Sequence, residues 1–140
     1  MRTVLASCLL LLLSTIMNLS CKKPPPPDTI ATLTRDFGFA LPAGVKVVGS
    51  QREDGDGMLR AKLLMSADQW REFAATSLVP VAEMDSDMGY VGANQGWWDP
   101  QGSVNPHSGS VNRPNGYALH IGYDDGDPNQ VRVFIVLHGT

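Results

Sequence analysis

The aromatic pair Trp97-Trp98, followed directly by Asp99, is the most suggestive place for binding chemistry in this chain. Neighbouring side chains of an extended segment point to opposite sides, so one indole can pack on a sheet while the other faces solvent. An exposed tryptophan beside polar side chains suits a sugar ring or a protein surface. The other interpretation is that both rings cover the core beneath a glycine-rich loop. We predict a ligand or partner contact through Tyr90, Trp97, Trp98 and Asp99.

The three histidines, His107, His120 and His138, do not predict a metal site. His120 and His138 fall on one face of an expected hairpin, where His120 pairs opposite Phe134. At about 3.3 Å per residue this places the two histidines roughly 13 Å apart, or roughly 7 Å apart after a two-residue register shift, too far for one ion. His107 lies in a loop whose path the sequence does not determine. We therefore expect no metal and no cofactor.

Two acidic turns raise the question of calcium. In the turn at 54–57, taking Gly57 as the invariant glycine of a calcium loop puts the first and last ligand positions at Arg52 and Leu63, whose side chains cannot bind calcium. The second turn, at 124–129, holds more aspartates, but ordinary turn chemistry explains them. Neither turn predicts a calcium site.

Nucleophilic catalysis and nucleic-acid binding both lack support. Ser108-Gly109-Ser110 does not lie in the strand-to-helix context of a nucleophile elbow. The chain has 11 basic and 14 acidic residues, and phosphate binding needs clustered Lys and Arg. We predict a protein that is not an enzyme and does not bind nucleic acid.

The first 20 residues have the pattern of an export signal. Arg2 supplies positive charge before the apolar run Val4–Met17, and Ser20 is a small residue at the expected cleavage point. The run is shorter than the roughly 20 apolar residues that a membrane-spanning helix needs. We therefore expect export and cleavage rather than a permanent membrane span.

Leu19-Ser20-Cys21, after a short leucine-rich run, resembles the lipobox of bacterial lipoproteins, with Asn18 where that family usually has leucine. The resemblance implies that the Cys21 thiol receives a diacylglycerol, that the signal is cut before it, and that the new amino group is acylated. Lys22 is similar to the pattern of lipoproteins that reach the outer membrane, if the host has two membranes. The other cysteine, Cys8, lies inside the leader, where a disulfide to Cys21 would make no structural sense.

The chain divides into three parts. Residues 1–20 form the signal peptide, residues 21–27 the lipid anchor and a proline-rich stalk, and residues 28–140 a single small domain. Pro24–Pro27 predicts a polyproline II spacer of roughly 12 Å. The domain should therefore sit close to the membrane surface.

Alternating apolar residues predict two hairpins in the domain. The first joins strands at 45–51 and 58–65, and the second joins strands at 117–123 and 131–138. Between the hairpins, Ser66 and Gln69 form a capping-box pattern at the start of a helix. A short helix is expected over Asp28–Phe37, capped by Asp28 and stopped by Gly38. These elements predict an α+β domain, in which a mainly antiparallel four-stranded sheet (β-β-α-β-β) packs on one capped helix.

The second hairpin has a well-specified face. Its apolar pairs would be Tyr123 with Val131, Ile121 with Val133, Leu119 with Ile135 and Tyr117 with Leu137. A one-residue slip would destroy this match, so the pattern specifies the parity of the register, that is, which residues share a face. Phe134 and Val136 on the opposite face indicate that this face is also partly covered, by the long segment that precedes the hairpin.

That segment, residues 83–116, has no clear assignment. It is rich in Gly, Asn, Ser, Asp and Pro, and it offers two short strand candidates, Gly89–Val91 and Gln95–Trp98. A run of this length without structure is unusual in a compact domain, so it is functional or hides short elements.

The leading functional hypothesis is a membrane-tethered envelope lipoprotein that acts as a non-catalytic binding module, with an inhibitor or immunity protein as its specific form. The alternatives are a carbohydrate- or peptidoglycan-binding module that uses the Trp97-Trp98 loop, and a structural component of an envelope complex. The expected partners are the membrane, through the lipid on Cys21, and an envelope protein or glycan. The expected location is the periplasmic face of the outer membrane in a host with two membranes.

Overall fold

A computed structural model describes residues 28–53 and 57–139 of the chain. The expected export signal, Cys21 and the proline stalk lie outside the described residues, as does most of the first acidic turn. Within the described ranges, no helix is both long and apolar enough to cross a membrane.

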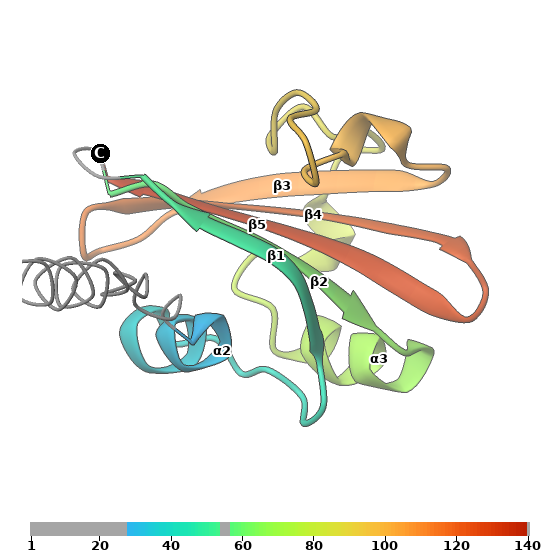
Figure 1. Ribbon diagram of the computed structural model, residues 1–140, viewed down its shortest axis with the longest axis horizontal. Helices are drawn as coiled ribbons and strands as arrows, with labels where there is room; N and C mark the ends of the chain where they lie inside the picture. Colours follow the sequence, from blue (N-terminus) through green and yellow to red (C-terminus); the bar gives the residue numbers. More distant parts are fainter. Residues whose placement is uncertain (1–27, 54–56, 140) are drawn as a thin grey trace, which may run out of the picture.

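The domain is built on one antiparallel sheet with the strand order β1-β2-β5-β4-β3 (Figure 1). The strands are β1 Lys46–Arg52, β2 Leu59–Met65, β3 Pro106–Asn112, β4 Tyr117–Asp127 and β5 Gln130–Gly139. The prediction of a four-stranded sheet on one helix is therefore wrong. The sheet has a fifth strand, β3, and the described fold is mostly β with short helices.

The missed strand β3 is held by its neighbours rather than by its own sequence. Its residues, rich in Ser and Gly and opened by Pro, have low β-propensity. It pairs with β4 on one side, and on the other side Ser108 and Asp85 exchange two backbone hydrogen bonds of 2.8 and 2.9 Å. A Cβ on Gly109 would lie 2.9 Å from Val79 Cγ1. Close packing therefore requires glycine at a position where the sequence pattern suggests a loop.

The helices lie on one face of the sheet, below it in Figure 1. They are α2 Thr29–Ala31, continued by one π-helical segment, η1 Thr32–Asp36, and α3 Ala67–Ala75. Two single 3-10 turns follow: η2 Val81–Glu83 lies just before residue 84, and η3 Pro100–Gly102 lies further along the irregular segment.

Local sequence signals set the ends of these helices. The Asp28 carboxylate accepts hydrogen bonds from the first N–H groups of α2, and Gly38 after η1 has a φ of 74°. At α3, the Ser66 hydroxyl accepts from the Gln69 N–H while the Gln69 side chain accepts from the Ser66 N–H. The predicted N-terminal helix and the predicted capping box are both confirmed.

Two hydrophobic cores lie on opposite faces of the sheet. The larger one packs the helices against the first face; its central side chains include Leu33, Leu63, Phe73, Leu119, Ile121, Val133 and Ile135. The smaller one lies under the loop of residues 84–105, above the sheet in Figure 1, and consists of Met88, Val91, Trp98, Phe134 and Val136. The prediction that the long segment covers the second face is confirmed.

The chain passes from one face to the other around the outer edge of β3. Met84 packs against the first core, Asp85 pairs with Ser108 at the edge, and Met88 lies in the second core. This bridge therefore pairs the outer edge of β3 at Ser108, and after it the chain continues across the second face.

The β4–β5 hairpin has the predicted parity but a register shifted by two residues. Tyr123 pairs with Val133, and Ile121 pairs with Ile135. The ladder continues to Asp127 and Gln130, so most of the predicted turn is strand. A shift of two keeps every side chain on its predicted face, which explains why hydrophobic alternation alone did not detect the error.

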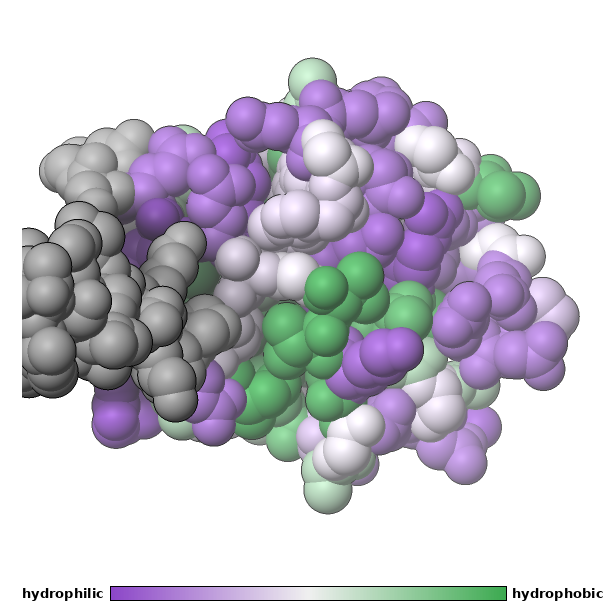
Figure 2. Space-filling view, viewed as in Figure 1, coloured by the Kyte–Doolittle hydropathy of each residue, from purple (hydrophilic) through white to green (hydrophobic). Residues whose placement is uncertain are grey.

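The outer strand β1 contains a bulge between Val47 and Gly49. Val48 is the extra residue, and its side chain is 40% exposed. A bulge in an edge strand hinders pairing with another chain. Figure 2 shows a small apolar patch in the lower middle of this view, with polar surface above and to its right.

Candidate functional site

All four residues of the predicted contact belong to the loop 84–105. Trp98 is the anchor of this loop. Its ring is only 2% exposed and meets Phe134 edge to face, with 5.2 Å between centroids. Its indole N–H donates to the backbone carbonyl of Val91 at 3.2 Å. A buried ring with its N–H paired contributes to the core and holds the two arms of the loop together.

Trp97 lies on the outer part of the sheet. It is half-buried and meets Trp98 edge to face at 5.7 Å. The indole rests on the backbone of Gly49, where an added Cβ would lie 2.6 Å from Trp97 Cδ2. Of the two arrangements considered for this pair, the structure has both rings packed over the second core.

Asp99 joins the loop to the sheet through charge. Its carboxylate lies 2.6 Å from Lys62 Nζ and 3.5 Å from Arg132 Nη1. Lys62 is buried, and its ammonium lies 5.7 Å from the centroid of the Phe134 ring. A buried lysine needs such partners, because an unpaired charge there would be costly.

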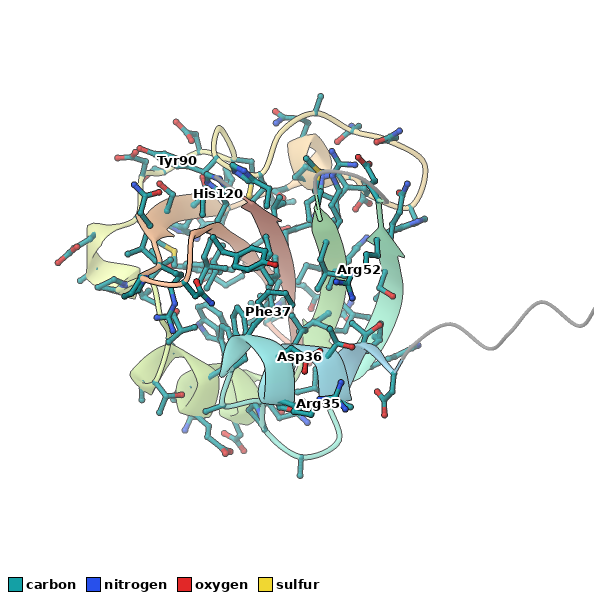
Figure 3. The ribbon with its side chains drawn as sticks, turned by 90° about the vertical axis from the view of Figure 1, so that its left-hand side faces the viewer. Arg35, Asp36, Phe37, Arg52, Tyr90 and His120 are labelled. Atoms are coloured by element: carbon teal, nitrogen blue, oxygen red, sulfur yellow. The ribbon has the colours of Figure 1, made fainter. Side chains whose placement is uncertain are left out.

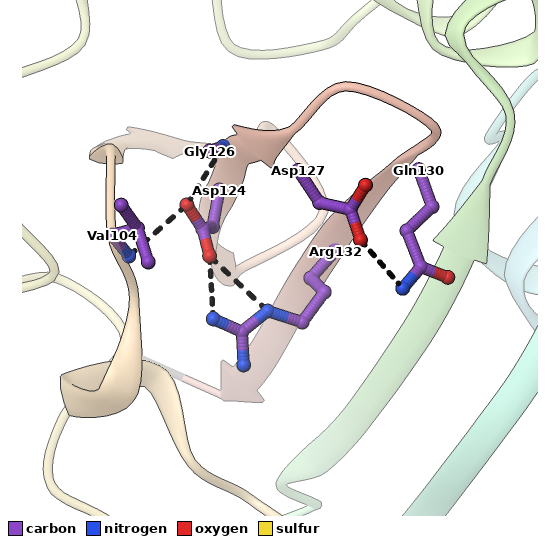
Figure 4. Close-up of a pocket in the computed structure, with 6 residues that line it drawn as sticks. All are labelled: Val104, Asp124, Gly126, Asp127, Gln130 and Arg132. Atoms are coloured by element: carbon purple, nitrogen blue, oxygen red, sulfur yellow. Dashed lines mark hydrogen bonds and ion pairs between the residues drawn. The ribbon is translucent and has the colours of Figure 1, made fainter.

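Arg132 connects this contact to Asp124 at the β4–β5 end (Figure 4). The Asp124 side chain is 4% exposed, and Arg132 Nη2 lies 2.5 Å from its Oδ2. Its Oδ1 accepts hydrogen bonds from the N–H groups of Val104, Asn105 and Gly126 at 3.2, 2.8 and 3.1 Å. Burial by itself would raise the pKa of Asp124, but these hydrogen bonds and the guanidinium outweigh it and lower the pKa below its usual range.

A hollow of about 300 Å³ opens beside this ion pair. It is lined by Val104, Asp124, Gly126, Asp127, Gln130 and Arg132. Its charged side chains already have partners: Asp124 holds Arg132, and Asp127 accepts from Gln130 Nε2 at 3.1 Å (Figure 4). Asp124 and Arg132 in the hollow therefore serve the attachment of the loop, while the Asp127 carboxylate accepts from the neutral donors Gln130 Nε2 and the Asn129 N–H.

The tip of the loop, residues 92–96, is exposed throughout. It is nevertheless held in shape, because Gln101 Nε2 donates to the Gly92 carbonyl at 3.0 Å and the Gln101 N–H donates to Asn94 Oδ1 at 2.9 Å. Gln95 and Trp98 exchange two backbone hydrogen bonds of 2.6 and 3.0 Å. The predicted strand at 95–98 is thus a tight turn closed by an isolated bridge.

Tyr90 is the exposed member of the predicted contact residues, with 44% of its surface accessible. Its ring lies nearly parallel to that of His120, at 6.3 Å between centroids and 19° between planes. Figure 3 shows Tyr90 and His120 at one end of the sheet, on the opposite side from Arg35 and Asp36 of the helical face. Tyr90 therefore presents an aromatic surface that is supported from below.

The histidines are arranged differently from the prediction. His120 Nε2 and His138 Nε2 lie 2.8 Å apart, so the predicted separation of roughly 7–13 Å is wrong. His120 pairs with Val136 in the ladder, which makes His138 its diagonal neighbour, and long side chains can meet across a diagonal. His107 lies on the other face, 4.7 Å from the ring of Tyr123.

The three histidines therefore do not converge. Among the residues that the structure describes, no group of three or more His, Cys, Asp or Glu side chains could hold a metal ion. The histidine pair was missed because the expected separation counted backbone spacing alone, whereas two imidazoles at diagonal positions can reach each other across the ladder.

Sequence reasoning also missed the roles of Lys62 and Arg132. Both point from β2 and β5 toward the second face, where an alternating pattern suggests solvent. Phe134 and Val136 on the same face were the signal that something covers it, and a covered lysine or arginine requires a carboxylate partner.

Comparisons with known proteins do not add to this geometry. No protein-family model, no curated protein and no solved structure matches the chain. The functional argument therefore depends on the loop and its contacts with the sheet.

Proposed function

We propose that this protein is a membrane-tethered envelope lipoprotein whose domain binds a protein partner without catalysis. The observation that carries the proposal is the loop 84–105, an irregular segment that is pinned to the sheet at many points and still exposes Tyr90 and its tip. Binding residues are often placed on loops held by a rigid scaffold. A loop already fixed in one conformation loses little entropy when it binds.

Contacts of several different kinds hold the loop on the sheet, so its conformation does not depend on any single contact. Trp98 is buried and bonded to Val91. Asp99 is paired with Lys62, and Asp124 accepts from the backbone at the far end of the loop. Rigid support of this kind is what a recognition surface needs to hold its contact residues in place.

The packing of the two tryptophans makes a protein a better candidate than a sugar for the partner of this loop. Trp98, one of the two rings proposed for a sugar platform, is buried, and Trp97 lies flat on Gly49. The exposed part of the loop includes one tyrosine, Tyr90, one valine, Val104, and a polar, glycine-rich tip. Tyrosine among small polar residues is a common composition of protein-recognition loops. An inhibitor or immunity protein is the specific form of this proposal.

The charged side chains support a non-catalytic role. Lys62, Asp99, Arg132 and Asp124 form one chain of ion pairs that holds the loop on the sheet. A general acid or base must be able to exchange protons with a bound substrate. These four groups are instead committed to stabilising the fold.

The tether is proposed from the lipobox-like sequence at Cys21. The described fold begins with the cap residue Asp28, directly after the proline stalk. A stalk of roughly 12 Å would keep the domain next to the bilayer. The partner is therefore expected in or at the membrane.

Crosslinking in intact envelopes tests the binding proposal. The native protein should yield a stoichiometric protein adduct, and Tyr90→Ala should reduce that adduct about tenfold or more, as expected for a central aromatic contact. The matched control is Val48→Ala, which truncates a side chain of similar exposure on the edge strand β1. This control should crosslink like the unchanged protein.

Two results would contradict the proposal. The first is equal adduct from Tyr90→Ala and the unchanged protein, which would place the contact elsewhere. The second is no protein adduct together with a change of tryptophan fluorescence on adding glycan fragments, which would replace the protein partner with a glycan.

A further inference from the structure

The two imidazoles of His120 and His138 meet end to end. Their Nε2 atoms lie 2.8 Å apart, their ring centroids 5.0 Å apart, and their planes differ by 10°. The centroid distance exceeds the nitrogen distance by roughly two ring radii, so the nitrogens point straight at each other. This is the geometry of one N–H···N hydrogen bond in a shared plane.

A proton fits between these nitrogens, whereas a metal ion does not. Metal–imidazole bonds are about 2.0–2.1 Å long, so an ion in line between two nitrogens would hold them about 4 Å apart. The pair is therefore read as a hydrogen bond, and its proton can be assigned from the neighbouring contacts.

The carbonyl of Gly139 determines where the protons lie. It is 3.3 Å from His138 Nδ1, and because a carbonyl only accepts, His138 Nδ1 carries the hydrogen. In the neutral ring His138 Nε2 is then an acceptor, so His120 Nε2 is the donor. His120 Nδ1 is left as a lone pair, buried and without a hydrogen-bond partner among the described residues.

The histidine pair cannot take up an added proton without leaving a buried N–H unpaired or breaking the N–H···N bond. If the N–H···N bond is kept, the proton must end on His120 Nδ1, where no acceptor is within reach. If both rings are charged, two N–H groups face each other and the bond must break. Either outcome is unfavourable in a partly buried position.

The surroundings of His120 offer no compensation. β3 places Ser110 opposite it, β5 places Val136 opposite it, and the loop places Tyr90 over the ring. The charge that acts on it within the described residues is that of His138. Burial, and secondarily the repulsion from His138, lowers the pKa of His120 below its ordinary value.

We propose that the His120–His138 hydrogen bond is a proton-sensitive contact that supports Tyr90 at neutral pH and opens on acidification. Opening removes this side-chain link across the β4–β5 ladder, which itself stays paired, and releases the ring beneath Tyr90. The Tyr90 surface is therefore rigid at neutral pH and loosened in acid. This proposal does not depend on the identity of any partner.

Nitrogen NMR of the histidine side chains in the purified protein tests the proton assignment directly. At about pH 7.5, His138 should carry its proton on Nδ1 and His120 on Nε2. On acidification the ring signals of Tyr90 should shift with the same midpoint as those of His120. The opposite tautomer of His120, or Tyr90 signals that do not follow His120, would overturn the proposal.

A stability measurement on variants provides a second readout. The pKa of His120 is lowered in the folded state, so on acidification the unfolded chain takes up this proton at a higher pH than the folded chain does. The contribution to stability is therefore present above the unfolded pKa of about 6.5 and falls as the pH drops below it. Between about pH 7.5 and about pH 5.5 this raises the unfolding equilibrium constant by up to about tenfold.

His120→Phe keeps a ring beneath Tyr90 and removes the titration, so it should lose this part of the pH dependence. His107→Phe, which replaces the histidine on the opposite face, should keep it. Equal pH dependence in His120→Phe and the unchanged protein would overturn the proposal, and the NMR titration decides the matter if the variant does not fold.

Discussion

At Asp124 one carboxylate joins three segments of the chain. It holds Arg132 on β5, and it accepts from the N–H groups of Val104 and Asn105 at the end of the loop and of Gly126 on its own strand. Every partner is a donor, so both carboxylate oxygens must accept, and the negative charge is what Arg132 requires. The lowered pKa of Asp124 expresses the same preference for the charged form.

Asp124→Asn should reduce the free energy of unfolding by roughly 2 kcal/mol, because it removes the charge that Arg132 requires and turns an NH₂ donor toward a group that is itself a donor. The lowered pKa also means that the contribution is present above the unfolded carboxyl pKa of about 3.9 and is lost as pH falls through the folded pKa. Urea titrations at neutral and acidic pH measure both effects, and the variant should be less sensitive to acid than the unchanged protein.

Asp68→Asn is the control for Asp124→Asn. Asp68 pairs with Arg71 on the surface of α3, where both side chains are mostly exposed, and such pairs contribute at most a few tenths of a kcal/mol. A loss as large for Asp68→Asn as for Asp124→Asn would contradict the role given to the buried carboxylate.

At the scale of elements, the bulge in β1 and the loop over the second face depend on each other. The bulge shifts the pairing so that Gly49 lies opposite Lys62, whose side chain belongs to the second face. Gly49 then presents bare backbone to the ring of Trp97. A strand residue with any side chain at this point would push the loop away from the sheet.

Gly49→Ala should lower the free energy of unfolding by about 1–3 kcal/mol, because the new Cβ would lie within 2.7 Å of two atoms of the Trp97 ring. Tryptophan fluorescence during urea denaturation measures the loss and reports the displaced ring. Gly102→Ala is the control, since a Cβ there meets no atom within 4 Å and its φ is not positive. Equal stability of the two variants would show that Trp97 does not rest on β1.

On the scale of the whole molecule, the loop 84–105 gives the sheet a covering layer on its second face. The loop passes around the outer edge of β3 at the Asp85–Ser108 bridge and places Met88, Val91 and Trp98 on that face. Both faces of the sheet thus have a covering layer. The contact surface that we propose belongs to the outer side of the second layer, at Tyr90 and the tip 92–96.

Membrane attachment is also a property of the whole chain. Cys21→Ala should move the protein from the membrane fraction to the soluble fraction, because the proposed acyl chains account for its firm binding. Fractionation followed by immunoblotting measures this shift. Cys8→Ala, in the leader, should leave the protein in the membrane fraction. Continued membrane attachment of Cys21→Ala would contradict the lipoprotein proposal.

The sequence by itself determined the features that depend on near neighbours. The caps at Asp28 and Ser66 were predictable because each side chain bonds to backbone within three residues. The faces of β2, β4 and β5 were predictable because alternation has a period of two, which fixes which side of the sheet a residue occupies.

Only the tertiary structure decided the features that depend on distant partners. β3 has little β-propensity and exists because β4 and Asp85 pair with its two edges. The His120–His138 bond depends on a two-residue choice of register that leaves the apolar pattern unchanged. The burial of Trp98 and the support beneath Tyr90 depend on how residues 84–105 cross the sheet, and those contacts join positions that local sequence cannot relate.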